Sequence, residues 1–221
     1  MGTKLFLQAV QEGKIEQVSR MLEDEPELAG AHTDKGLSGL LLAAYYGQLQ
    51  IARLLANRRS DLTLFEACVV GDLLLVKALA SANPELINGY SDDGYHPLGL
   101  AAFFNQPDVA RYLVEHGAEV NRVTHNRQHI APLISAAASG ALPIARLLLE
   151  HGADANASQE GGFTALHNAA QNGQLEMIEL LLSHRTEINP RADNGKTPLA
   201  LALETGRSEA AALLRQRGAI Q

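Results

Sequence analysis

The chain has 221 residues, of which 46% are hydrophobic and 19% are charged, a composition typical of a folded protein. Its formal net charge of −7 argues against a nucleic-acid-binding protein and against attraction to an anionic membrane surface, because both need clustered Lys and Arg. The single cysteine, Cys68, cannot form an internal disulfide, and no run approaches the roughly 18 apolar residues of a membrane-spanning helix. We therefore expect a soluble, cytoplasmic protein.

A short pattern recurs along the whole chain: a small residue within an apolar stretch, followed a few positions later by Gly or Asn. The small residues that mark this pattern are Ala9, Ala43, Ala67, Ala101, Ala136, Ala169 and Ala202. Subtracting neighbouring positions gives spacings of 34, 24, 34, 35, 33 and 33 residues. Such a period indicates a repeat architecture.

Each unit is predicted to contain two helices joined by a tight turn. The residue that ends the first helix is Gly in six units and Asn105 in one, and both types adopt the left-handed conformation that closes a helix. A second stretch with helical apolar spacing follows, for example IARLLLEHGA at 144–153. A single helix pair cannot bury its apolar face, so neighbouring units are expected to stack. The approximate repeats are 2–35, 36–59, 60–93, 94–128, 129–161, 162–194 and 195–221.

Four segments resemble the signatures of the ankyrin repeat family: LVEHGAEVN (113–121), LLLEHGADANA (147–157), GGFTALHNAAQNG (161–173) and DNGKTPLALA (193–202). The resemblance implies an all-α solenoid of stacked helix–turn–helix repeats with short β-hairpin fingers along one edge, as a single domain over 1–221. The first three units depart from the signature. The spacing of 24 leaves no room for a finger after residue 59, so we expect a trimmed loop there, with a local kink or an abrupt junction.

Several motifs suggest chemistry but are better explained by the repeat. NGKT (194–197) resembles the end of a phosphate-binding loop, yet Pro190 stands where that loop needs Gly, and Thr197-Pro198 reads as a helix start. Cys68 takes a buried small-residue position. Asp92 and Asp93 lack the remainder of a calcium loop.

The histidines are also expected to be structural. His116, His151 and His184 take equivalent places near the ends of second helices, where stacking separates them by about 10 Å, whereas Zn–N bonds need about 2 Å. His125 and His129 fall in a finger loop, where their i,i+4 spacing loses its helical meaning. We expect no metal, no cofactor and no enzymatic activity.

A surface remains as the candidate for function. Helical geometry turns Phe103 and Phe104 nearly opposite to Leu98, Ala101 and Ala102, whose small side chains mark the packed side. In the ankyrin family these two positions look onto the concave groove beside the fingers, where partners commonly bind. The residues expected to contact a partner are Leu37, Tyr45, Tyr46, Val69, Val70, Asp92, Asp93, Tyr95, Phe103, Phe104, Ser139, Phe163, Gln171 and Asn172.

The sequence thus predicts a non-enzymatic protein–protein interaction module that binds another protein in this groove as an adaptor, an inhibitor or a regulatory partner. Asp92, Asp93 and Glu160 would add an acidic rim that favours a partner with basic groups. One alternative is a small-molecule-binding regulatory protein that uses the aromatic groove. Another is that the aromatic side chains pack against each other across units and close the groove. The polar first and last units predict a monomer when no partner is bound.

Overall fold

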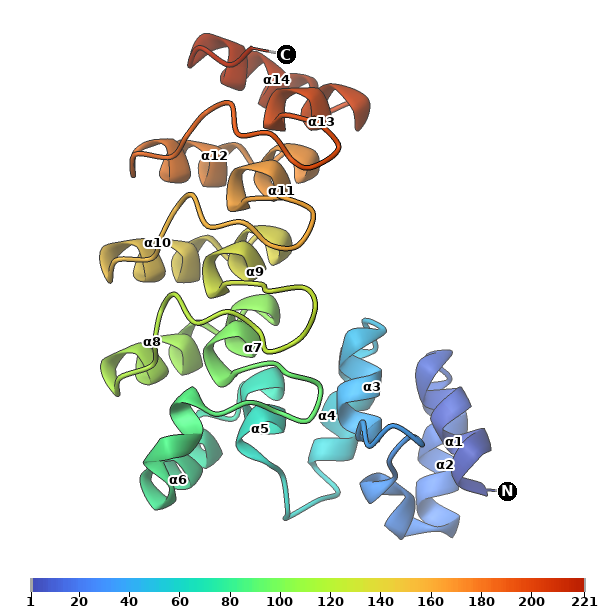
Figure 1. Cartoon of the computed structure of the whole chain (residues 1–221). Helices are drawn as coiled ribbons and strands as arrows, with labels where there is room; N and C mark the ends of the chain where they lie inside the picture. The colour runs from blue at the N-terminus through green and yellow to red at the C-terminus, as the bar shows by residue number, and fades with distance from the viewer. Residues whose placement is uncertain (1, 221) are drawn as a thin grey trace. The chain divides into compact units, whose positions relative to one another are not determined.

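A computed structural model describes residues 2–220. Within that range the chain forms fourteen α-helices, arranged as seven consecutive helix–turn–helix pairs (Figure 1). The contacts divide the chain into two compact units, unit 1 (residues 1–83) and unit 2 (residues 84–221). The fold class predicted from the sequence is confirmed. The single domain over 1–221 and the seven repeat boundaries stay predictions.

Unit 1 contains three helix pairs and one 3-10 turn. Its elements are α1 (Gly2–Gln11), α2 (Ile15–Asp24), η1 (Pro26–Gly30), α3 (Gly39–Tyr45), α4 (Leu49–Ala56), α5 (Leu64–Val70) and α6 (Leu73–Ala82). Its core includes the fully buried side chains of Phe6, Leu22, Leu40, Ile51 and Leu55. Pro26 opens η1 because its fixed φ suits a first helical position, where the missing N–H has no partner to lose.

Unit 2 contains four helix pairs after a second 3-10 turn. Its elements are η2 (Pro84–Asn88), α7 (Pro97–Phe103), α8 (Pro107–Glu115), α9 (Pro132–Ser139), α10 (Leu142–Glu150), α11 (Ala165–Asn172), α12 (Leu175–Leu182), α13 (Pro198–Glu204) and α14 (Ser208–Gln216). The first helices α7, α9, α11 and α13 pack side by side, and the second helices form a second row beside them (Figure 1). Ala101, Ala136, Ala169 and Ala202 are completely buried between the first helices. Their small side chains allow this close approach.

The helix ends follow the predicted turn chemistry. Gly71, Gly140 and Gly173 end their helices with φ between 72° and 79°, and Asn105 takes the same left-handed region with φ 52°. The hydroxyl of Thr197 accepts a hydrogen bond from the Ala200 N–H at 3.2 Å, and Pro198 occupies the first turn of α13. The NGKT segment is therefore the start of a repeat helix.

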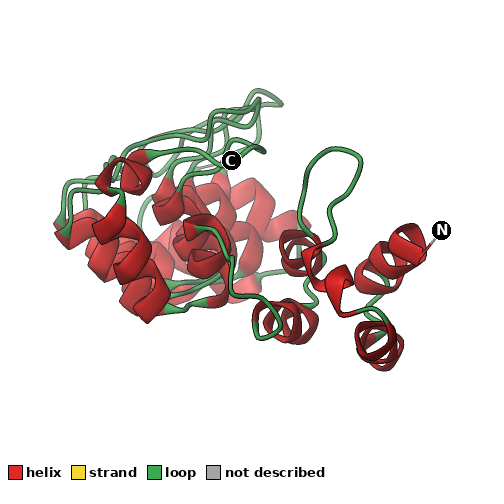
Figure 2. Cartoon of the chain, turned by 90° about the horizontal axis from the view of Figure 1, so that it is seen from below, coloured by secondary structure: helices red, strands yellow, loops and turns green. Residues whose placement is uncertain are grey.

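The fingers are tight turns rather than extended strands. Each is closed by backbone hydrogen bonds, as between Ser91 N–H and the Tyr95 carbonyl at 2.8 Å, and the described residues contain only two isolated β-bridges. In unit 2 the fingers are also joined to one another. Backbone N–H groups of His125, Glu160 and Asp193 donate to carbonyls of the preceding finger at 2.8–2.9 Å. Figure 2 shows these loops gathered along one side of unit 2.

The expected trimmed loop lies between α4 and α5. The link covers only residues 57–63 and contains no finger. Arg59 is held inside it: its Nη1 donates to Glu66 Oε1 at 2.7 Å and its Nε to Asp61 Oδ1 at 2.9 Å. Glu66 is buried and also accepts the Thr63 N–H, which closes a capping box at the start of α5.

A row of asparagines connects the loops that follow the second helices of unit 2, and the sequence analysis missed it. The side chain of Asn121 donates to the Gly152 carbonyl at 3.0 Å and accepts the Asp154 N–H at 2.8 Å. Asn88 and Asn156 make the same pair of bonds to the next loop, and Asn189 accepts the Ile220 N–H. The spacings of 33, 35 and 33 residues were the available signal.

The outer helices are less polar than the sequence suggested. Leu5 and Ile15 are exposed in the first helix pair, and Ile220 is exposed after α14. The description of the first and last units as polar is therefore only partly correct. Within residues 2–220, no helix has the length and apolar content needed to cross a membrane.

Candidate partner-binding surface

The end of α7 exposes one aromatic ring. Leu98, Ala101 and Ala102 are buried on one side of the helix, while Phe103 is 46% exposed and Phe104 is half-buried. The two rings meet edge to face, with their centroids 5.1 Å apart. The predicted direction of Phe103 away from the packed side is consistent with this burial pattern. The exposed group is Phe103 rather than the pair.

The equivalent positions of the next three first helices are polar except for Ala138, and three of the polar side chains donate hydrogen bonds to the preceding first helix. The Ser139 hydroxyl donates to the Ala102 carbonyl at 2.9 Å, and Asn172 Nδ2 donates to the Ala138 carbonyl at 3.2 Å. The Thr205 hydroxyl likewise donates to the Gln171 carbonyl at 3.1 Å. These bonds reach carbonyls at the ends of helices, where fewer donors are available within the helix. Ser139, Gln171 and Asn172, all expected to contact a partner, are exposed, and Ser139 and Asn172 have structural roles as well.

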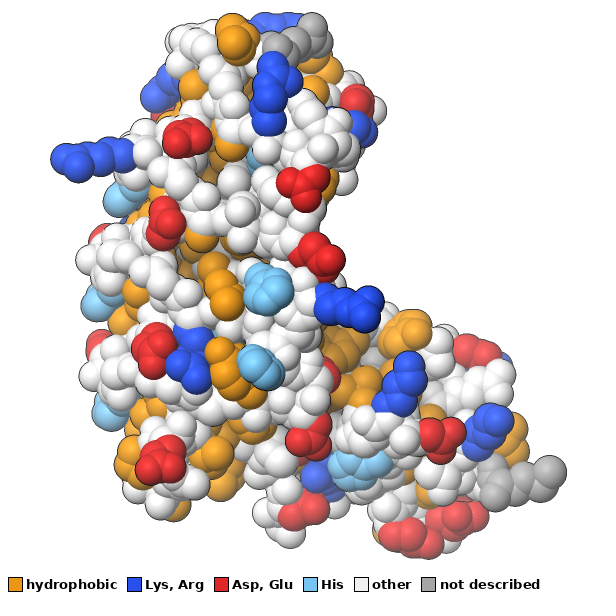
Figure 3. All heavy atoms as spheres, in the orientation of Figure 1, with side chains coloured by type: hydrophobic (Ala, Val, Ile, Leu, Met, Phe, Trp, Pro, Cys, Tyr) orange, Lys and Arg blue, Asp and Glu red, His pale blue; other side chains and the backbone are white. Residues whose placement is uncertain are grey.

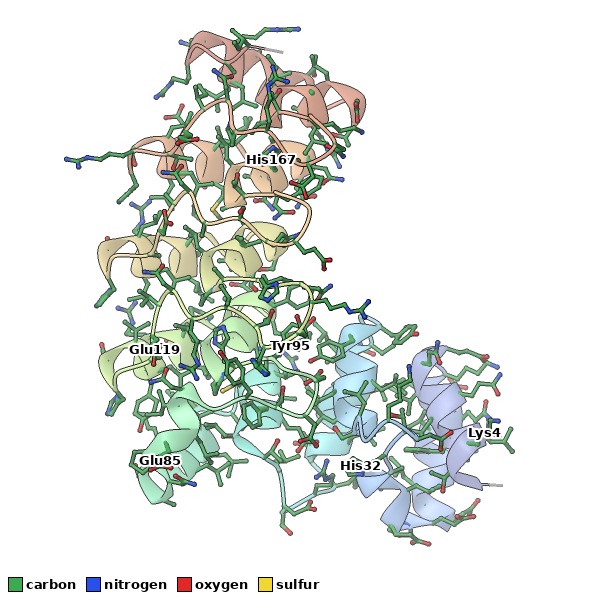
Figure 4. The ribbon with its side chains drawn as sticks, in the orientation of Figure 1. Lys4, His32, Glu85, Tyr95, Glu119 and His167 are labelled. Carbon is green, nitrogen blue, oxygen red and sulfur yellow. The ribbon has the colours of Figure 1, made fainter. Side chains whose placement is uncertain are left out.

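The finger residues of unit 2 are more constrained than expected. Tyr95 is half-buried and its hydroxyl donates to Gln128 Oε1 at 2.8 Å, among the finger loops in Figure 4. Phe163 is half-buried, with its ring 5.4 Å from that of His167. Asp93 is half-buried, and only Asp92 is exposed.

Unit 1 carries the remaining predicted contacts. Tyr46, the residue directly after α3, is 52% exposed, whereas Tyr45, Leu37 and Val70 are half-buried. The prediction for Val69 is wrong, because this side chain is 1% exposed. α5 buries five of its seven residues, and Glu66, its one charged residue, is among them. A helix that is almost entirely apolar is a buried helix, and LFEACVV already contained that signal.

The sequence analysis also overestimated the exposed aromatic surface. Of the six aromatic side chains placed in exposed positions, only Phe103 and Tyr46 are exposed, and the other four are half-buried: Tyr45, Tyr95, Phe104 and Phe163. One ring thus remains as a prominent surface feature in each unit.

The histidines near the ends of second helices bind their own helices. Nδ1 of His116, His151 and His184 lies 2.8–2.9 Å from the carbonyl four residues earlier. Such a contact supplies a hydrogen-bond donor to a carbonyl at the end of a helix. Among the described residues, no cluster of three or more His, Cys, Asp or Glu side chains could hold a metal ion.

Two other histidines begin helices from buried positions. Nδ1 of His96 accepts the Gly99 N–H at 3.1 Å, and Nδ1 of His167 accepts the Thr164 N–H at 3.1 Å. Burial, followed by the nearby Arg122 charge, lowers the pKa of His96 from 6.5 to about 4. Burial also lowers the pKa of His167, whose Nε2 contacts the Lys196 carbonyl at 3.1 Å. Cys68 is buried as predicted, and burial raises the pKa of its thiol, which opposes nucleophilic chemistry.

A comparison with protein families identifies the repeat. The family model described as "Ankyrin repeats (3 copies)" matches residues 64–159 and 133–220, which together span more than half of the chain. The chain belongs to the ankyrin repeat family. Ankyrin repeats are generally protein–protein interaction modules and typically non-enzymatic scaffolds. The match begins at α5, so the three-copy model does not establish the number of repeats.

Proposed function

We propose that this protein is an interaction module that captures a partner protein on unit 2, on the face formed by the fingers and the ends of the first helices, with Phe103 as the apolar anchor. The observation that carries the proposal is the 46% exposure of the Phe103 ring on a helix whose opposite side is completely buried. Aromatic side chains are frequent energetic anchors of protein interfaces. An adaptor, an inhibitor and a regulatory partner would all use such a surface.

The surroundings of Phe103 indicate the character of the partner. The next two repeats present Ala138-Ser139 and Gln171-Asn172 at the equivalent places, so the apolar anchor would be bordered by small and polar groups. Among the finger residues, Asp92, Glu160 and Asp193 are exposed acids, and Arg127 and Arg191 are exposed bases. This small excess of acidic groups favours a partner segment with a basic group beside an apolar side chain.

The proposal is tested by affinity capture from cell extract with the wild-type protein, Phe103→Asp and Leu5→Asp. Leu5 is an exposed apolar side chain of α1, so its variant adds the same charge away from the proposed surface. Proteins captured by the wild type and by Leu5→Asp, but lost with Phe103→Asp, are the expected result. Binding of one purified candidate should then weaken at least about tenfold with Phe103→Asp, a change of about 1.4 kcal/mol. Identical captured sets for the two variants would contradict the proposal.

A further inference from the structure

A hollow of about 470 Å³ opens in unit 1 beside the link that lacks a finger. The end of α4, the link, and the turn between α5 and α6 together form its walls. Its volume lies within the range of about 300–1,000 Å³ in which proteins bind small groups. The hollow belongs to neither the fingers nor the surface around Phe103.

A buried ion pair, Arg59–Glu66, fixes one wall of the hollow. Arg59, which contributes to that wall, has its guanidinium directed to Glu66 at 2.7 Å and to Asp61 at 2.9 Å. Both the Arg59 and the Glu66 side chains are less than a tenth exposed. Because Glu66 also closes the capping box of α5, the short link has little freedom to collapse into the hollow. A site with fixed walls loses little conformational entropy on binding.

The lining of the hollow combines apolar side chains with one available cation. Ala56, Leu62, Val70 and Leu75 supply apolar surface, and Arg53 is exposed on the last turn of α4. The one carboxylate in the lining, Asp72, already accepts the Leu75 N–H at 3.0 Å as the N-cap of α6. The chemistry that fits is an apolar group that carries a negative charge beside it, because Arg53 would pair with the charge.

Apolar surface continues outside the hollow. Leu74, between Asp72 and Leu75 on the first turn of α6, is 81% exposed. The second residue of the other second helices is Glu16, Gln50, Asp108, Pro143, Glu176 and Glu209. Leu74 therefore departs from a mostly polar position in the repeat that follows the missing finger. Figure 3 shows hydrophobic side chains exposed over α6.

We infer that unit 1 has a second binding site, formed where the finger was lost, for a short segment of a partner protein in which leucine-sized side chains are flanked by acidic residues. One apolar side chain enters the hollow, an acidic residue pairs with Arg53, and a neighbouring apolar side chain covers Leu74. A chain segment fits better than a small molecule, because a ligand confined to the hollow would leave Leu74 uncovered. This site does not depend on the function proposed for Phe103.

The test uses the full chain and a fluorescein-labelled peptide, Gly-Ser-Glu-Leu-Leu-Glu-Ser-Gly, in fluorescence polarisation. Two control peptides replace both Glu by Lys or both Leu by Ser. The acidic leucine peptide should bind at least about tenfold more tightly than either control. Arg53→Glu should weaken its binding about tenfold or more, since attraction becomes repulsion. Ala56→Phe should abolish binding by filling the hollow.

Arg146→Glu is the matched control for charge. Arg146 has the same place in α10 (IARLLL, 144–149) as Arg53 has in α4 (IARLLA, 51–56), and it is exposed, but it lies in unit 2. Its variant should leave peptide binding unchanged. If Ala56→Phe fails to fold, as judged by circular dichroism, Leu74→Asn provides a second variant on a side chain that barely contacts the fold, and it should weaken binding severalfold.

Four results would overturn the inference. The first is the absence of peptide binding at about 1 mM. The second is equal binding of the lysine peptide, and the third is an equal loss with Arg53→Glu and Arg146→Glu. The fourth is binding of octanoate, a small apolar carboxylate, with no binding of the peptide. Phe103→Asp should retain peptide binding, so failure at one site can be distinguished from failure at the other.

Discussion

His96 makes the N-terminal capping of α7 dependent on pH. Its imidazole accepts the Gly99 N–H in a buried position, which requires the neutral form of the ring at Nδ1. Burial and the nearby Arg122 charge lower its pKa to about 4. A threonine in this role, as at Thr197 in α13, does not titrate. The repeat can therefore begin a helix with either chemistry, and the histidine makes the start of α7 sensitive to acid.

We expect stability to fall as the pH drops from about 6.5 toward about 4. Between these values the unfolded chain binds a proton at His96 that the folded chain excludes, so the free energy of unfolding decreases with decreasing pH. The full contribution is present above pH 6.5, and its loss amounts to about 3 kcal/mol. Urea unfolding at pH 7 and pH 4 measures the effect. His96→Thr should reduce the pH dependence, whereas the exposed His125→Thr should not; parallel curves for all three proteins would contradict the assignment.

Single residues also show how far the sequence predicts the site. The direction of Phe103 follows from the 100° turn per residue, because α7 has small and large side chains on opposite sides. The same rule fails for Val69, since α5 is packed on nearly every side and position alone does not expose a residue. The hydrogen bond from the Ser139 hydroxyl to the Ala102 carbonyl could not be predicted, because it depends on the approach of two helices and joins residues 37 positions apart.

The link between α4 and α5 depends on one buried ion pair. Arg59→Met should leave the Glu66 carboxylate buried without its cation, which costs about 3–5 kcal/mol. The hydrogen bonds of Glu66 to Thr63 alone cannot replace the lost charge interaction. The double variant Arg59→Met/Glu66→Gln should be more stable than Arg59→Met, because no uncompensated charge remains. Urea unfolding monitored by circular dichroism compares the variants, and additive losses would refute the coupling.

The asparagine row should carry measurable stability in unit 2. Asn121→Ala removes two hydrogen bonds between successive loops and should cost about 1–3 kcal/mol, since the Gly152 carbonyl and the Asp154 N–H lose their partner. Asn121→Asp keeps the acceptor and loses only the donor, so its loss should be smaller at neutral pH. Chemical unfolding of both variants tests this order. Equal stability of Asn121→Ala and the wild type would show that water replaces the side chain without cost.

Among the elements, the helices and their turns were predictable, and the connections between them were not. The positions of Gly140, Gly173 and Asn105 locate helix ends, because the left-handed conformation is a local property of the chain. The short spacing also revealed the missing finger. By contrast, the role of Arg59 in the link could not be deduced, since its partner Glu66 lies on the next helix and both charges are exposed in most sequence contexts.

At the level of the whole molecule, the stacking of helix pairs determines how far the destabilisation caused by one substitution extends along the chain. Leu148 is completely buried in α10, which packs against α8, α9 and α12. Leu148→Ala should therefore cost about 2–5 kcal/mol. Because each repeat contacts only its neighbours, hydrogen-exchange protection should fall mainly from α8 to α12 and less in α14. Arg146→Ala, on an exposed side of the same helix, is the control. An equal loss of protection throughout unit 2 would show that its four helix pairs open together.

The placement of the ion pairs makes the molecule unevenly sensitive to ionic strength. Lys196–Glu204 and Arg217–Glu179 are pairs between exposed or half-exposed side chains, and dissolved ions weaken exposed pairs much more than buried ones. Arg59–Glu66 is the one pair within residues 2–220 in which both side chains are less than a tenth exposed. Concentrated salt would thus weaken the electrostatic contacts of the repeat surface while leaving this one nearly intact. The link between α4 and α5, where the repeat pattern is interrupted, therefore holds the ion pair that is best shielded from the solvent.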